Sequence, residues 1–157
     1  MNINRMEIRQ AVLDFLDLIE TGRETPEANV QALEIMVDWL GLAYHFAEIP
    51  FDDDDQPEPP VPEYRHFREL ATTRFPDFGF YNIPSVISDR IMEADLHMGD
   101  ALDDLTDIAR GLWAVRWAWE NTSEADALWH FRFGYDSHWG DHLRNLQRYL
   151  HAFKNRL

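Results

Sequence analysis

Cysteine is absent from the 157 residues of the chain. This excludes disulfides, thiol nucleophiles, and zinc or iron–sulfur sites that depend on cysteine ligands. Long apolar runs are missing as well, because no stretch approaches the ~18 uncharged apolar residues of a membrane span. Residues 1–7 hold no apolar segment of the kind found in signal peptides. We therefore expect a cytoplasmic protein without a membrane span.

Basic residues are scarce. The chain has 14 Lys and Arg against 29 Asp and Glu, and its formal net charge is −15 at pH 7. Nucleic-acid binders need Lys and Arg to displace the counterions of phosphates, and anionic membrane surfaces also attract basic segments. We therefore expect no nucleic-acid partner and no membrane partner. A basic protein, a cation or a small ligand is a more natural partner for an acidic surface.

Hydrophobic residues make up 45% of the chain and aromatic residues 13%. This composition is typical of a folded protein, and the length suits a single domain over residues 1–157. Five of the six Trp lie in one stretch near the C-terminal end: Trp113, Trp117, Trp119, Trp129 and Trp139. The C-terminal third should therefore contain the densest core or a pocket.

Helical spacing and capping residues predict an all-α bundle of five or six helices, mostly antiparallel to their neighbours. The predicted helices cover residues 3–21, 26–48, 64–75, 85–97, 100–120 and 123–153. Gly22 is a plausible helix stop, and Thr25-Pro26 fits an N-cap followed by the first helical residue. Ser123, with Asp126 three residues later, fits a variant of the capping box at the start of the last predicted helix. A kink is expected near Gly134, and no strand is predicted.

Two segments do not have a helical pattern. Residues 49–62 contain five Pro and the acidic run Asp52–Asp55, which indicates an extended, solvated connection because Pro removes donors and like charges repel. A cation or a basic partner could also bind this segment. The aromatic segment Phe75–Pro84 is expected either to plug one end of the bundle or to cover a pocket.

A string of carboxylates opens the fifth predicted helix: Asp100, Asp103, Asp104 and Asp107. Paired carboxylates on a helix can hold a hard cation such as Mg²⁺. On a helical wheel, however, these residues lie opposite the apolar stripe formed by Leu105, Ala109 and Leu112, a face that usually contacts water. A solvated face is the expected role, and a metal site that includes Asp103 and Asp107 is the alternative.

His138 and His142 are spaced i, i+4 on the last predicted helix. This spacing directs two imidazoles toward one point, as in helical metal sites. Asp141 could serve as a third ligand or could orient one of the histidines. Because both His lie at the edge of the apolar stripe, a purely structural role is also open.

Charged residues also fall within the apolar stripes. Arg116 does so on the fifth predicted helix, as do Arg132 and Asp136 on the last. A charge on a core-facing stripe must be paired or must reach water. We therefore expect Arg116, Arg132, Asp136 and His142 to form one polar network between helices, with Arg132 and Asp136 as a buried pair. Such a network could be structural or could bind an anionic ligand.

Two motifs resemble a known family. They are Asp103-Asp104-Leu105-Thr106-Asp107-Ile108 and His138-Trp139-Gly140-Asp141-His142, the second of which is preceded by Trp129-His130-Phe131-Arg132-Phe133. In this order they resemble a bacterial family known as domain of unknown function 5063, over roughly residues 100–151. The resemblance implies a helical domain and assigns no activity.

Two functions from different classes remain open. The favoured one is a non-catalytic binding or regulatory protein without a cofactor, which acts through its acidic surface or through a pocket lined by Trp, Arg and His. Its binding residues would be Arg116, Arg132, Asp136, His138 and His142. The alternative is a metal-dependent hydrolase of a phosphate ester or nucleotide. Its divalent metal would be held by ligands drawn from His138, Asp141, His142, Asp103 and Asp107.

Overall fold

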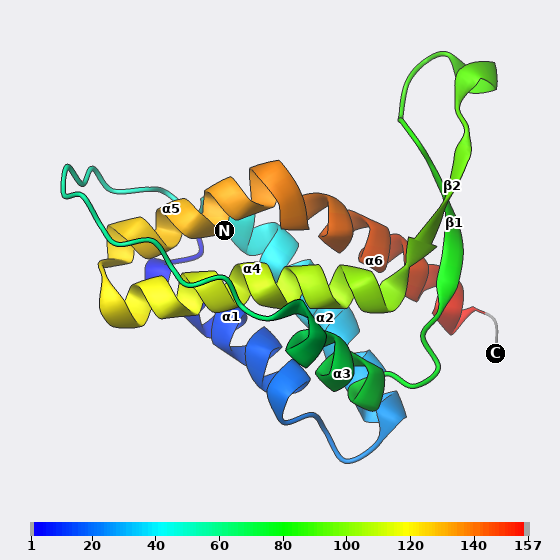
Figure 1. The fold of residues 1–157 in the computed structure, drawn as a ribbon, viewed down its shortest axis with the longest axis horizontal. Helices are drawn as coiled ribbons and strands as arrows, with labels where there is room; N and C mark the ends of the chain where they lie inside the picture. Colours follow the sequence, from blue (N-terminus) through cyan, green and yellow to red (C-terminus); the bar gives the residue numbers. More distant parts are fainter. Residues whose placement is uncertain (1, 156–157) are drawn as a thin grey trace.

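The computed structural model describes residues 2–155, which form a helical bundle with one projecting β-hairpin (Figure 1). Helices α1 (Arg5–Glu20) and α2 (Pro26–Phe46) pair through a short turn. Gly22 has a φ of +80° in this turn, which a residue without a Cβ adopts at low cost. Thr25 is the N-cap of α2, and its side chain accepts a hydrogen bond from the Ala28 backbone N–H at 3.1 Å.

Helix α4 (Ala101–Asn121) lies at the centre of the bundle. It packs against α1, α3 (Tyr64–Arg74), α5 (Glu124–Gly134) and α6 (Gly140–Lys154). Its position follows from its composition, because a helix that is apolar around most of its circumference must be covered on several sides. The fully buried apolar residues along its length are Ala101, Leu105, Ile108, Ala109, Leu112, Val115 and Ala118.

The last predicted helix is interrupted without being broken. Between α5 and α6 the chain forms a π-helical segment, Tyr135–Trp139. The backbone stays in the right-handed helical region at Gly134 and at Gly140, so α5 and α6 form one continuous helix with a local bulge. Ser123 caps its start, as predicted, by accepting a hydrogen bond from the Asp126 N–H at 3.0 Å. The irregularity predicted near Gly134 is therefore this π-helical bulge.

The predicted helix over residues 85–97 is wrong, and the fold is therefore not purely all-α. Strands β1 (Phe80–Pro84) and β2 (Leu96–Asp100) pair antiparallel, with Phe80 opposite Asp100. A single 3-10 turn, Ile91–Glu93, lies in the connection between them. The hairpin projects away from the bundle (Figure 1), so neither of its faces is fully covered. Without a buried face, the alternation that normally identifies a strand is missing.

The two segments without a helical pattern lie against the bundle. The connection from Ile49 to Pro62 contains no helix or strand, as expected, and runs over α5 and α4 before reaching α3 (Figure 1). Of the aromatic segment, Phe75 and Phe78 are buried against the end of α6. These two residues fill the bundle end and, with Pro76 and Asp77, also line a pocket of about 500 Å³ against α2 and α6. Both expected roles therefore apply, and the residues after Gly79 form β1. Among residues 2–155, no helix has the length and apolar character needed to span a membrane.

Candidate metal site

The carboxylates at the start of α4 face protein, which contradicts the solvated face predicted for them. Asp104 is only 4% exposed, and the Asp107 side chain is only 12% exposed. Asp100 caps α4 through the Leu102 N–H at 3.0 Å. The helical-wheel prediction of a solvated face failed because a helical wheel considers only the apolar residues of one helix. In the fold, α3, α6 and the hairpin cover the opposite face of α4.

The two histidines of the predicted metal motif lie where the π segment meets α6. His138 belongs to the π segment, His142 to the first turn of α6. Their ring centroids are 5.0 Å apart at an angle of 78°. His138 is more than half exposed, whereas the His142 side chain is only 23% exposed. One histidine is therefore open to solvent and the other is partly enclosed.

Asp107 and the two histidines converge on one point. The Asp107 Oδ2 atom lies 3.5 Å from His142 Nε2 and 3.9 Å from His138 Nε2. One candidate ligand atom from each residue lies within 4.8 Å of the others. Ligand atoms around one tetrahedral ion at ~2.0–2.2 Å are separated by about 3.3–3.6 Å. Small rotations of the exposed His138 side chain would therefore complete a three-ligand site.

A buried carboxylate orients the enclosed histidine. The Nδ1 atom of His142 lies 2.8 Å from Asp104 Oδ1, and Asp104 Oδ2 accepts a hydrogen bond from the hydroxyl of Tyr81 in β1. When Nδ1 donates its proton to a carboxylate, the lone pair of Nε2 is free to bind a metal. In this structure Nε2 is the atom that faces Asp107.

Burial and charge act together on these groups. Burial raises the pKa of the Asp104 carboxyl, and the hydrogen bonds from His142 and Tyr81 only partly offset this rise. For His142, burial works against the charged ring, but the carboxylates of Asp104, Asp107 and Asp103 outweigh it and raise its pKa. Burial and the bond to Asp104 also raise the pKa of Tyr81.

The other predicted metal ligands lie outside this trio. Asp103 accepts a hydrogen bond from the Tyr64 hydroxyl at 2.5 Å, and burial together with this bond raises the pKa of Tyr64 to about 12. Asp141 is exposed on α6 and is not among the converging residues. The second oxygen of Asp107 accepts a hydrogen bond from Arg110 at 3.2 Å, which leaves Oδ2 toward the histidines.

The predicted polar network of Arg116, Arg132, Asp136 and His142 is wrong. Arg116 forms a bidentate ion pair with Glu20, with distances of 3.0 and 2.7 Å. Arg132 donates to the Ala47 carbonyl at 2.9 Å. Asp136 is exposed and accepts from the Tyr44 hydroxyl, and the Arg132 guanidinium lies 5.0 Å from the ring centroid of the same tyrosine. Arg132 and Asp136 therefore meet only through Tyr44, and Arg116 and His142 have other partners.

Within residues 2–155, no ion pair joins Arg132 to Asp136. The π segment accounts for the error. It changes the direction in which Asp136 projects relative to α5, and spacing along a regular helix cannot anticipate that change.

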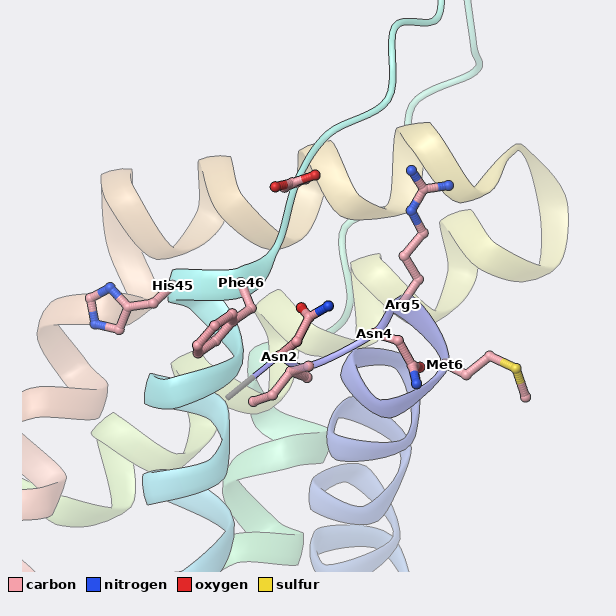
Figure 2. Close-up of a pocket in the computed structure, with 8 residues that line it drawn as sticks. Asn2, Asn4, Arg5, Met6, His45 and Phe46 are labelled. Atoms are coloured by element: carbon pink, nitrogen blue, oxygen red, sulfur yellow. The ribbon is translucent and has the colours of Figure 1, made fainter.

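A pocket and an acidic cluster lie apart from this trio. A pocket of about 520 Å³ opens between the start of α1 and the end of α2 (Figure 2), lined by Asn2, Ile3, Asn4, Arg5, Met6, His45, Phe46 and Glu48. It contains none of the predicted site residues.

The carboxylates of Asp52, Asp53 and Asp54 also lie close together. All three are exposed, and Asp52 accepts a hydrogen bond from the Ser123 hydroxyl at 2.8 Å, so this cluster holds the connection against α5.

Sequence reasoning missed two residues of the site. The helical wheel placed Asp104 on a solvated face of its helix, and Tyr81 was placed only within the aromatic segment Phe75–Pro84. No signal for Asp104 was present in the sequence, because α3, α6 and the hairpin provide the cover over this side of α4. Nothing in the sequence connects Tyr81 to Asp104, since that contact depends on the hairpin.

One comparison with known proteins shows the family of this chain, and another shows its fold. A family model described as a domain of unknown function (DUF5063) matches residues 51–156. No curated protein matches the chain. The crystal structure of protein BF1032 from Bacteroides fragilis is similar, with a TM-score of 0.71, 20% identity, and coverage of 95% of this chain and 90% of that chain. At this identity the likeness shows the fold alone. Because the family model covers more than half of its residues, the chain belongs to the DUF5063 family, whose function is unknown.

Proposed function

We propose that this member of the DUF5063 family is a divalent-metal-binding domain with a binding or regulatory role. Its protein ligands are Asp107, His138 and His142. The observation that carries this proposal is that one ligand atom from each residue lies within 4.8 Å of the other two. The three residues come from two helices that are distant in the sequence, α4 and the π segment with α6.

Two features of the surroundings support a metal site over a casual group of polar residues. Histidines that bind metals commonly donate their second N–H to a carboxylate, and His142 has such a partner in the buried Asp104 at 2.8 Å. π-Helical bulges occur frequently at functional sites, and here the bulge contains His138.

The donor set favours a transition metal. Imidazole nitrogens suit Zn²⁺ and its neighbours in the first row, whereas Mg²⁺ and Ca²⁺ prefer oxygen ligands alone. Zn²⁺ is therefore the first candidate. Three protein ligands leave at least one coordination position for water or for an added ligand, and the exposed side of His138 leaves access to that position.

The charges around the site do not favour a phosphate ester as substrate. Asp103 and Asp104 lie next to the ligand Asp107 on α4, and carboxylates repel an approaching phosphate. The nearest guanidinium, that of Arg110, is occupied by Asp107 at 3.2 Å and by the Pro62 carbonyl at 3.1 Å. We therefore favour metal-dependent binding over hydrolysis of a phosphate ester or nucleotide.

The test is a Zn²⁺ titration of chelator-stripped protein, followed by competition with a chromogenic chelator. The wild type should bind one ion, and Asp107→Asn, His138→Ala and His142→Ala should each weaken binding at least tenfold. His130→Ala is the matched control, because His130 also faces a carboxylate, Asp126, at 3.6 Å but has no third ligand in the converging group. Absence of stoichiometric binding, or equal binding by the ligand variants and the control, would overturn the proposal.

A further inference from the structure

The metal site is connected to the base of the hairpin by a chain of three polar groups. The Tyr81 hydroxyl donates to Asp104 Oδ2. The other oxygen of Asp104 lies 2.8 Å from His142 Nδ1, and His142 Nε2 faces Asp107 at 3.5 Å. Tyr81 therefore lies two contacts from the proposed metal ligand atom, although it belongs to β1.

We propose that Tyr81 is a positioning residue of the metal site, and that through Asp104 it couples metal affinity to the conformation of the hairpin base. This inference rests on the proposed function. Asp104 is 4% exposed, so an oxygen that loses its donor cannot easily find water in its place. Without the Tyr81 hydroxyl, the carboxylate is free to rotate and holds His142 less firmly.

The hairpin determines where the Tyr81 hydroxyl lies. Tyr81 is opposite Gly99 in the ladder, and a Cβ at Gly99 would collide with the Tyr81 ring. The ring also packs against Tyr149 of α6 at 5.2 Å between centroids. Its position therefore requires the pairing of β1 with β2, and any opening of the hairpin base removes the donor to Asp104.

The remainder of the hairpin is accessible. Ile87, Ile91 and Met92 are 90%, 82% and 95% exposed near its tip. Coupling between two sites is reciprocal in free energy. A metal that tightens the Tyr81–Asp104–His142 chain must therefore also stabilise the hairpin base, and a molecule that binds the hairpin would change metal affinity.

The experiment compares Tyr81→Phe with Tyr149→Phe. The Tyr149 hydroxyl accepts a hydrogen bond from the Gly79 N–H at 3.1 Å, so its loss also affects the hairpin base but leaves Asp104 untouched. Loss of a group that orients a metal ligand typically costs 10–100-fold in affinity. We expect Tyr81→Phe to weaken Zn²⁺ binding about tenfold, and Tyr149→Phe to change it less than twofold.

Two further measurements separate positioning from general destabilisation. The visible spectrum of the Co²⁺-substituted protein should change in Tyr81→Phe and remain that of the wild type in Tyr149→Phe. Hydrogen exchange in residues 79–101 should slow when Zn²⁺ is added to the wild type, and this slowing should be lost in Tyr81→Phe.

The outcomes distinguish this inference from the function on which it rests. If the wild type binds no metal, the proposed function fails. If the wild type binds through Asp107, His138 and His142 but the two Tyr variants behave alike, only the role of Tyr81 is refuted. A change in affinity with an unchanged Co²⁺ spectrum would also refute it, because that result indicates lost stability without a change in ligand geometry.

Discussion

Two His–Asp contacts in this protein have the same chemistry but different surroundings. In α5, His130 and Asp126 are 3.6 Å apart within one helix, and Asp126 accepts a second contact from the neighbouring Thr122 hydroxyl. His142 and Asp104 are 2.8 Å apart and join α6 to α4. Among residues 2–155, only the second contact lies beside additional ligand atoms, those of Asp107 and His138. Convergence of several helices, more than the His–Asp contact itself, is what produces a candidate metal site.

The two His–Asp contacts should differ most in how far removal of the carboxylate lowers the free energy of unfolding. Asp104→Ala leaves His142 and Tyr81 without their acceptor in a buried place. This should cost about 3 kcal/mol, near the low end for a broken buried pair because the His142 ring is 23% exposed. Asp126→Ala should cost about 1 kcal/mol, because the 3.6 Å contact with His130 is longer than a hydrogen bond and the Thr122 hydroxyl keeps its bond to the Ala118 carbonyl. Urea unfolding of metal-free protein measures both, and equal losses would contradict the comparison.

Zn²⁺ should stabilise the folded protein through the site at His142 and His138, and not through His130. An ion that binds only the folded state raises the free energy of unfolding by about 2.7 kcal/mol when its concentration is 100 times its Kd. We expect this full gain for the wild type and for His130→Ala, and a gain of about 1.4 kcal/mol or less at the same Zn²⁺ concentration for His138→Ala, whose affinity should be at least tenfold weaker. Thermal unfolding with and without Zn²⁺ provides the measurement. A full gain that persists in His138→Ala would mean that the ion binds elsewhere on this acidic chain.

The packing of Trp139, which lies between His130 and His142 in the sequence, can be tested by replacing nearby glycines with alanine. A Cβ on Gly111 would lie 2.6 Å from Trp139 Cδ1, and Trp139 is fully buried. Overpacking costs about 1–3 kcal/mol, and the better helix propensity of Ala returns up to ~1 kcal/mol. Gly111→Ala should therefore destabilise by about 1 kcal/mol net and alter the near-UV circular dichroism. Gly79→Ala is the control, since nothing lies within 4 Å of its Cβ position.

The smallest effect should be a pH dependence of the metal-free protein. The pKa of His142 is raised in the folded state: burial opposes the charged ring, but the neighbouring carboxylates outweigh it. Its contribution to stability is therefore complete below the unfolded pKa of about 6.5 and is lost as pH rises through the higher folded value. Urea midpoints between about pH 5.5 and 8.5 should fall more steeply for the wild type than for His142→Gln. Identical slopes would show that the carboxylates do not hold this proton.

The sequence predicted five of the helical segments well, because their capping residues and apolar spacing depend on near neighbours. Thr25 and Ser123 cap the helices expected of them. The same reasoning failed for residues 85–97, since a hairpin that projects from the bundle has no buried face to leave a pattern.

The site was predictable only in part. The i, i+4 spacing identified His138 and His142, and the acidic string identified Asp107. The exclusion of Asp103 and Asp141, and the inclusion of Asp104 and Tyr81, depend on how α3, α6 and the hairpin cover α4. Contacts of this kind join residues 23 and 38 positions apart, and helical periodicity contains no information about them.

The π segment also sets the rotational phase of the long last helix. A bulge of this type accommodates one residue more than a regular helix would, which offsets the following turns by roughly 100°. Upstream of it, Ala127, Leu128 and Phe131 face the core; downstream, Leu143, Leu146 and Leu150 do. Deleting a single residue there, for instance the exposed Ser137, would restore a regular helix with these two groups still on one side of it, whereas a regular helix of the present length would turn them roughly 100° apart. The bulge is therefore what keeps both halves of this helix facing the core at the present length, and we expect the chain to tolerate the loss of one residue in this turn better than the insertion of another.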